Sequence, residues 1–144
     1  MTVHLIKMAV GVTSTDHLVA LQKGRLIKGK RGAAPRFRHV TRNMPRRKEE
    51  LLDGGSIYWV IRGLIRVRQR VISLDRLVEE DARPRCAIGL DTALVRVDPR
   101  SRGPFQGWRY LEVTDAPSDL LGRDDDEAEM PDEMVAALRD LGLI

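Results

Sequence analysis

The pattern with the clearest chemical potential is a run of alternating arginines, Arg66, Arg68 and Arg70. Guanidinium groups bind phosphate through paired hydrogen bonds and stack on nucleobases. Alternate residues of a strand lie about 6.5–7 Å apart, which suits contacts to successive phosphates of one nucleic-acid strand. Tyr58 is expected on the same outer face, where it could stack on a base. The alternative is an exposed sheet face whose arginines protect an edge and keep the protein soluble.

A second basic group surrounds Pro45, a residue type favoured at the first position of a helix. Helix N-termini attract anions because their free N–H groups point outward. The segment Asp53-Gly54-Gly55-Ser56 could bring further backbone N–H groups nearby. No G-x-x-x-x-G-K-[ST] pattern is present, so the prediction is a phosphate site and not a nucleotide P-loop. The cations of this group are Arg42, Arg46, Arg47 and Lys48.

A third candidate is a pocket between residues 41–56 and 106–110. Trp108 and Tyr110 would share one strand face, while Gln106 and Arg109 could read a base edge or hold a small ligand. The alternative is that both rings simply face the core. The residues predicted to line this pocket are Thr41, Ser56, Gln106, Trp108, Arg109 and Tyr110.

Patterns for known catalytic centres are weak. The three histidines show no metal-like spacing with one another or with Cys86, which is interpreted as a small buried hydrophobe. The acidic run at 124–127 lacks EF-hand spacing, and no G-x-S-x-G is present. A triad of Ser56, His39 and an aspartate would be unspecific. The sequence therefore predicts no metal and no cofactor, and it leaves open whether the chain is an enzyme.

Charge is distributed very unevenly along the 144 residues. Residues 23–70 carry fifteen Lys or Arg and three acidic residues, whereas residues 112–144 carry eleven acidic residues and two arginines. Such a split is typical of an anion-binding body with an acidic tail, although it also fits two solvated surfaces. The single cysteine, the lack of a long apolar run and the N-terminal sequence together predict a cytoplasmic protein without a membrane span.

Hydrophobic periodicity predicts the elements that must position these residues. Strands are expected over 2–10, 36–41, 85–88, 92–97 and 108–113, with a hairpin over 56–72. Helices are expected over 14–27, 46–52 and 75–81, and again from Pro131. In the hairpin, an odd loop at 62–64 would place Ile57, Trp59 and Ile61 on the same side as Ile65, Val67 and Val71. The C-terminal helix would present an apolar face to a protein partner, formed by Met134, Ala137, Leu138 and Leu141.

Strands dominate the middle of the chain and do not alternate regularly with helices. This order predicts an α+β fold with a mixed or mostly antiparallel sheet, curled into a small barrel and flanked by an early helix and a C-terminal helix. Residues 1–121 would form one domain. Residues 122–144 would form an acidic linker and a short helix.

Several runs resemble an alphaproteobacterial family, domain of unknown function 1489, over nearly the whole chain. The runs are Met44-Pro45-Arg46-Arg47, residues 50–61, Arg68-Gln69-Arg70 and residues 105–111. A looser similarity is to PUA/ASCH-like barrels, which bind RNA or nucleotides, and it rests on Thr41-Arg42 and a Gly-bearing turn feeding a basic return strand. Some ASCH proteins are amidohydrolases that use a lysine, a threonine and a glutamate. Lys7, Thr41 and Glu50 are of those types, but no motif assigns them these roles.

The leading hypothesis is a nucleic-acid-binding module, with RNA favoured over DNA, that uses the basic hairpin face. The first alternative is a small hydrolase acting on a modified nucleoside or another anionic small molecule. The second is an interaction module that binds a partner through the C-terminal helix. The acidic tail could also compete with nucleic acid for the basic face.

Overall fold

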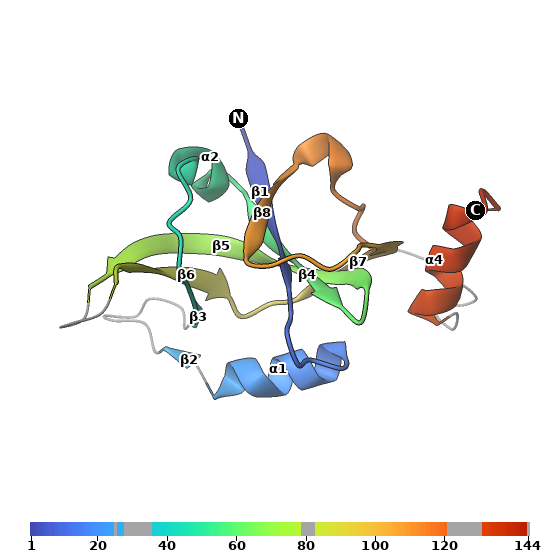
Figure 1. Ribbon diagram of the computed structural model, residues 1–144, viewed down its shortest axis with the longest axis horizontal. Coiled ribbons are helices and arrows are strands. Elements are labelled where there is room, and N and C mark those ends of the chain that lie inside the picture. The colour runs from blue at the N-terminus through green and yellow to red at the C-terminus, as the bar shows by residue number, and fades with distance from the viewer. Residues whose placement is uncertain (25, 28–35, 79–82, 121–130, 144) are drawn as a thin grey trace.

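The computed structural model describes residues 1–24, 26–27, 36–78, 83–120 and 131–143. Within these ranges the chain forms eight strands, three α-helices and one 3₁₀ turn (Figure 1). The strands are β1 (Val3–Met8), β2 (Leu26–Ile27), β3 (Arg36–Thr41), β4 (Ser56–Ile61), β5 (Leu64–Leu77), β6 (Arg85–Asp91), β7 (Val95–Ser101) and β8 (Trp108–Glu112). The helices are α1 (Thr15–Lys23), α2 (Lys48–Leu52) and α4 (Asp132–Asp140), and the 3₁₀ turn is η1 (Val113–Asp115).

All eight strands belong to one mixed sheet, which confirms the predicted α+β class. Its order is β2-β3-β6-β5-β4-β1-β8, and β7 pairs with β5. Only β1 and β4 run parallel; the other pairs are antiparallel. The long β5 pairs with β4 and β7 along its first half and with β6 along its second half. In the described residues β2 and β8 do not pair with each other, so the sheet is open and a closed barrel stays unconfirmed.

The hairpin between β4 and β5 corrects the predicted odd loop. Ile61 pairs with Leu64, so the loop has two residues, Arg62 and Gly63, both with positive φ as in a type I′ turn. A β-bulge at Arg66 then inserts one residue into β5 and restores the alignment of Trp59 with Val67. The bulge also sends Ile65 to the opposite face from Val67, against the prediction that both share a face.

Both faces of the central strands are buried, which explains why every residue of β4 is inaccessible. The larger core lies between α1 and the concave side of the sheet and includes Leu18, Trp59 and Ile88. A smaller core on the other side contains Ile6, Tyr58 and Val97. Burial on two sides favours the uninterrupted β-branched and aromatic sequence of β4 over an alternating one.

Three predicted helices differ from the structure. The helix expected over 14–27 ends at Lys23 as α1, and Leu26–Ile27 form β2 instead. The helix expected over 75–81 is absent within its described part, because β5 continues to Leu77 in register with β6. Helix α2 begins at Lys48, with Arg47 at its N-cap, so Pro45 does not start it. Pro45 is buried instead. The predicted strand over 92–97 is displaced to Val95–Ser101 as β7.

The C-terminal helix α4 packs beside β7, at the end of the sheet farthest from β3 (Figure 1). Val135 and Ala136 are its buried residues. Met134 and Leu141, predicted to face a partner, are 52% and 72% exposed. The acidic run at 124–127 lies outside the described residues. No described helix is both long enough and apolar enough to span a bilayer.

Candidate functional site

The hairpin arginines are mostly engaged with acidic side chains from the C-terminal part of the chain. Arg66 is 10% exposed and contacts Asp132 at 3.2 Å and Glu133 at 2.7 Å. Arg68 binds both carboxylate oxygens of Asp119 at 2.7 Å. Arg70 alone of the three is exposed. The hairpin therefore does not present three available guanidinium groups. The role of Arg66, Arg68 and Arg70 in binding stays a prediction.

Tyr58 and Ser56, two further predicted site residues, lie in a buried polar network. Tyr58 is 4% exposed and packs edge-on against His4, with ring centroids 5.1 Å apart. Ser56 is fully buried; its N–H donates to His4 Nδ1 at 3.0 Å, and its Oγ accepts from Arg68. Neither side chain reaches solvent. Both residues instead connect β1, β4 and β5 in the interior.

This network predicts a pH-dependent stability. Burial, and then the charge of Arg68, lowers the pKa of His4 below its ordinary 6.5, with Asp119 opposing in part. The unfolded chain therefore takes up a proton at a pH where the folded chain does not. The free energy of unfolding should fall as the pH drops below about 6.5. Urea unfolding at pH 8, 6 and 5 measures this.

A His4→Gln variant, whose amide can still accept from Ser56, should be less pH-sensitive in that range. His17→Gln on α1 is the control: its side chain is half-buried and accepts from the N–H of Thr13, a bond that a glutamine amide can also accept, and the variant should keep the wild-type pH slope. The pKa values of Asp119, Glu50 and Glu133 are lowered by arginine partners, so these carboxyl groups affect stability only below about pH 4.5. An unchanged pH slope in His4→Gln would show that another group is responsible.

The open side of the curled sheet holds a cleft, where β3 faces the β1–β8 pair. It consists of two adjoining hollows of about 680 and 530 Å³ that share Arg42, Asn43, Arg85 and Trp108. The residues that line it are Lys7, Val40, Thr41, Arg42, Asn43, Met44, Arg46, Arg76, Pro84, Arg85, Gln106, Gly107, Trp108 and Tyr110. Thr41, Arg42, Arg46, Gln106, Trp108 and Tyr110 were predicted from the sequence, whereas Ser56 and Arg109 lie elsewhere.

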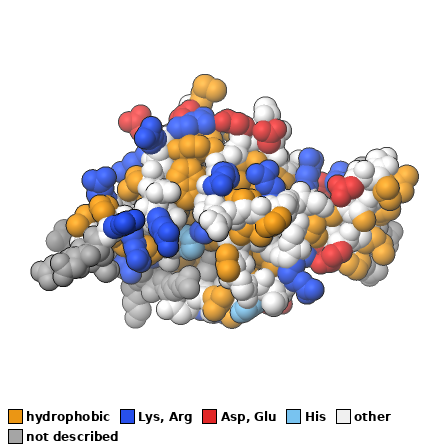
Figure 2. Space-filling model, in the orientation of Figure 1, with side chains coloured by type: hydrophobic (Ala, Val, Ile, Leu, Met, Phe, Trp, Pro, Cys, Tyr) orange, Lys and Arg blue, Asp and Glu red, His pale blue; other side chains and the backbone are white. Residues whose placement is uncertain are grey.

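Positive charge dominates the walls of this cleft. Its five cations are Lys7, Arg42, Arg46, Arg76 and Arg85. None of them forms an ion pair with another described residue, and the described lining includes no Asp or Glu. In the face that Figure 2 shows, several Lys and Arg side chains gather at the left, whereas acidic side chains lie along the upper edge and toward α4. Among the described residues the cleft is therefore a positively charged surface that attracts anions.

Hydrogen bonds hold the aromatic wall of the cleft in place. Trp108 Nε1 donates to the carbonyl of Asn43 at 3.0 Å, and Tyr110 Oη accepts from the N–H of Arg47 at 3.0 Å. The two rings pack edge-on at 4.9 Å, and both are half-buried. Arg47 itself is paired with Glu50 and Glu112, so it fixes the wall and is not available to a ligand. These contacts join β8 to the segment after β3.

Arg76 and Arg85 were missed from the sequence, and Lys7 was named only as a residue of the type that ASCH amidohydrolases use. Arg76 fell in a predicted helix, and β5 contains a second bulge between Val71 and Ser73. This bulge reverses which residues face inward, so Leu74 is buried and Arg76 lines the cleft. In the sheet, Lys7 lies opposite Trp59 of β4 on one side and Trp108 of β8 on the other. Burial lowers the pKa of its ammonium group. The alternation along β1 groups Lys7 with the inward-facing Val3 and Leu5.

A cysteine nucleophile and a metal centre both have little support at this site. Burial raises the pKa of the Cys86 thiol to about 11, so the group is protonated at neutral pH and is a weak nucleophile. Its Sγ contacts Met44 Sδ at 3.5 Å behind the cleft wall. Across the described ranges no three or more His, Cys, Asp or Glu residues are grouped as a metal site requires.

Comparison with known proteins gives one match. A family model described as "Protein of unknown function (DUF1489)" covers residues 5–144. No curated protein and no solved structure matches the chain.

Proposed function

Because the chain belongs to the DUF1489 family of proteins of unknown function, we propose a function from the geometry of the cleft. We infer that the protein binds single-stranded nucleic acid, with RNA preferred over DNA. The phosphates lie against the arginines of the cleft, and a base packs on Trp108. The observation that carries the proposal is the cluster of five cations without an acidic partner among the described residues.

The polar groups of the cleft support RNA as the ligand. Thr41, Asn43 and Gln106 carry side chains that both donate and accept hydrogen bonds. A ribose 2′-hydroxyl also donates and accepts, and it distinguishes RNA from DNA. A single strand is favoured because only unpaired bases are free to pack on an aromatic side chain. The open sheet is also compatible with a PUA/ASCH-like barrel whose gap serves as the binding cleft.

The two alternative functions are supported less well. Lys7 and Thr41 line the same hollow, as a hydrolase site would require, but Glu50 is bound to Arg47 and the described lining offers no carboxylate as a general base. A partner-binding role for α4 rests on the exposure of Met134 and Leu141. Neither observation explains the charge of the cleft, so we place nucleic-acid binding first.

Salt dependence tests the proposed function. If four of the five cations contact phosphates, the logarithm of the association constant should fall with the logarithm of salt concentration with a slope of about −3. Fluorescence anisotropy with a labelled single-stranded RNA octamer between 50 and 300 mM salt (on the order of the range over which such contacts are screened) measures it. A slope near zero, or no binding at the lowest salt, would rule the proposal out.

A further inference from the structure

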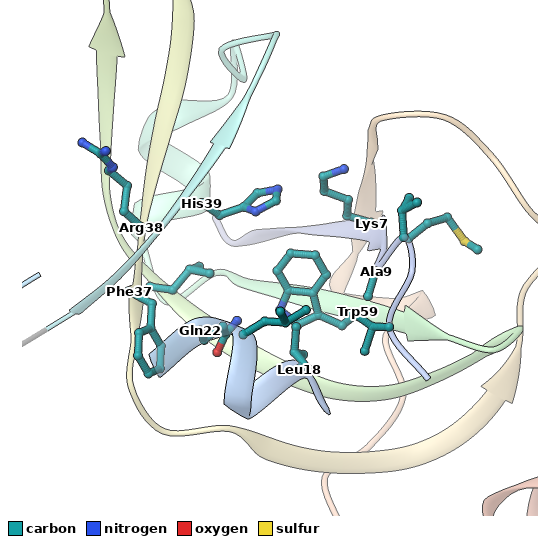
Figure 3. A pocket seen from close by; sticks show the side chains of 13 residues that line it. Lys7, Ala9, Leu18, Gln22, Phe37, Arg38, His39 and Trp59 are labelled. Atoms are coloured by element: carbon teal, nitrogen blue, oxygen red, sulfur yellow. The ribbon is translucent and has the colours of Figure 1, made fainter. Parts of the chain in front are cut away.

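A second hollow, which we name the Trp59 pocket, lies beyond the cleft between α1, the end of β1 and β3 (Figure 3). Leu18 and Leu21 of α1, Ala9 after β1, and His39 of β3 contribute to its walls. In Figure 3 Lys7 and His39 approach the mouth from opposite sides, with the indole of Trp59 between and below them. Arg38 points away from the ring. The pocket is therefore mainly apolar, with a cation and an imidazole at its mouth.

The volume of the Trp59 pocket fits a ligand with a single ring. Its volume is about 200 Å³. An apolar cavity of about 150 Å³ accommodates one benzene molecule. The Trp59 pocket thus has room for one six-membered ring with its substituents, such as a pyrimidine base.

Two glutamine side chains at the base of this pocket provide polar groups that can hydrogen-bond to the edge of a ring. Gln22 and Gln69 exchange two hydrogen bonds, at 2.6 and 2.8 Å, and Trp59 Nε1 also donates to Gln69. Gln69 donates further to the carbonyl of Asp91. Gln22, which lines the pocket, retains one N–H and one acceptor lone pair beyond these bonds. The pair with Gln69 uses the edge of the Gln22 amide where N–H and C=O run side by side, so the spare N–H and the spare lone pair lie on opposite flanks. Gln22 can therefore form one hydrogen bond to a polar atom at the edge of a base.

The Trp59 pocket and the cleft are consecutive along the same gap in the sheet. Residues 37–39 of β3 line the pocket, and residues 40–43 line the nearer hollow of the cleft. Lys7 lines both. A strand whose phosphates lie in the cleft therefore passes the mouth of the pocket, at the ammonium group of Lys7.

From this arrangement we propose that the Trp59 pocket receives one unstacked pyrimidine base of the strand bound in the cleft. The proposal rests on the proposed function, because the cleft supplies the phosphate contacts. The base unstacks from its neighbours and packs among the apolar side chains, while one polar atom at its edge forms a hydrogen bond with Gln22. Lys7 binds the phosphate at the point where the strand turns into the pocket.

The experiment compares two octamers of equal charge, oligouridylate and an abasic ribose-phosphate strand, by fluorescence anisotropy at low salt. Leu21→Trp, on a side chain that is 42% exposed, and Ala9→Met narrow the pocket from two different walls. Leu143→Trp adds the same bulk at a remote exposed position and is the matched control. Circular dichroism and thermal unfolding verify that each variant is folded.

Both narrowing variants should bind oligouridylate about tenfold more weakly than wild type, as expected for the loss of one base contact. Their affinity for the abasic strand should be unchanged, and the control should bind both strands as wild type. Equal affinity of narrowed and wild-type protein for oligouridylate would overturn the base pocket, as would an equal loss for both strands. If wild type binds neither strand, the proposed function fails and not only its base pocket.

Discussion

Replacing Arg42 and Arg85 together with alanine is expected to weaken the binding of single-stranded RNA about 100-fold at low salt. Each guanidinium offers a charge-assisted hydrogen bond to phosphate, worth about 1.5 kcal/mol at the lower end of its range. Both side chains are exposed and neither is ion-paired with a described residue, so their removal should leave thermal stability unchanged. The salt slope should become shallower by about 1.4, since each lost phosphate contact contributes about 0.7.

The matched control removes the same charge elsewhere. Arg70 and Arg100 are exposed, on β5 and β7, and neither lines the cleft. The Arg70→Ala, Arg100→Ala double variant should bind within about threefold of wild type, because distant surface charges are screened. Equal losses in the two double variants would show that overall charge, and not the cleft, determines binding. A larger loss in the control would return the binding surface to the hairpin face that the sequence predicts.

Much of the local structure could be predicted from the sequence because it depends on neighbouring residues. Alternation identified β3 at Arg36–Thr41, and Pro131 with the acidic residues after it identified the start of α4. The aromatic pair Trp108 and Tyr110 was correctly placed on one strand. Local chemistry decides these features, so the sequence patterns are sufficient.

The features that could not be predicted depend on contacts between distant parts of the chain. Whether Arg66 is available is decided by Asp132 and Glu133, and Arg68 is occupied by Asp119. The sequence pattern suggested acidic competition for the hairpin face, but not which acids would bind there. The two bulges of β5 reverse its inward face, and no turn residue marks them. The availability of the hairpin arginines therefore depends on ion pairs with distant residues, and the inward face of β5 depends on strand register. Composition indicates neither.

The Asp53-Gly54-Gly55-Ser56 segment illustrates the same distinction, because packing requires a glycine at position 55. The N–H of Gly55 donates to Leu51 at 2.9 Å, and its carbonyl accepts from Val71 at 3.0 Å. These bonds leave no backbone N–H of Gly55 for a phosphate. A Cβ at this position would lie under 3.0 Å from the carbonyl oxygens of both Leu51 and Val3. Gly55 thus permits the close approach of α2 to β1, which holds the segment that leads into the cleft.

Gly55→Ala is accordingly expected to destabilise the protein by about 3–4 kcal/mol, because two backbone oxygens cannot move aside as a flexible side chain would. Gly54 is the matched comparison. It has a φ of +84°, and a Cβ there would make only an ordinary contact with Thr2 Oγ1 at 4.0 Å, so Gly54→Ala should cost only the strain of a left-handed residue, about 1–2 kcal/mol. Urea unfolding followed by circular dichroism measures both. A larger loss in Gly54→Ala would mean that backbone conformation, and not the contact between α2 and β1, is the constraint on this turn.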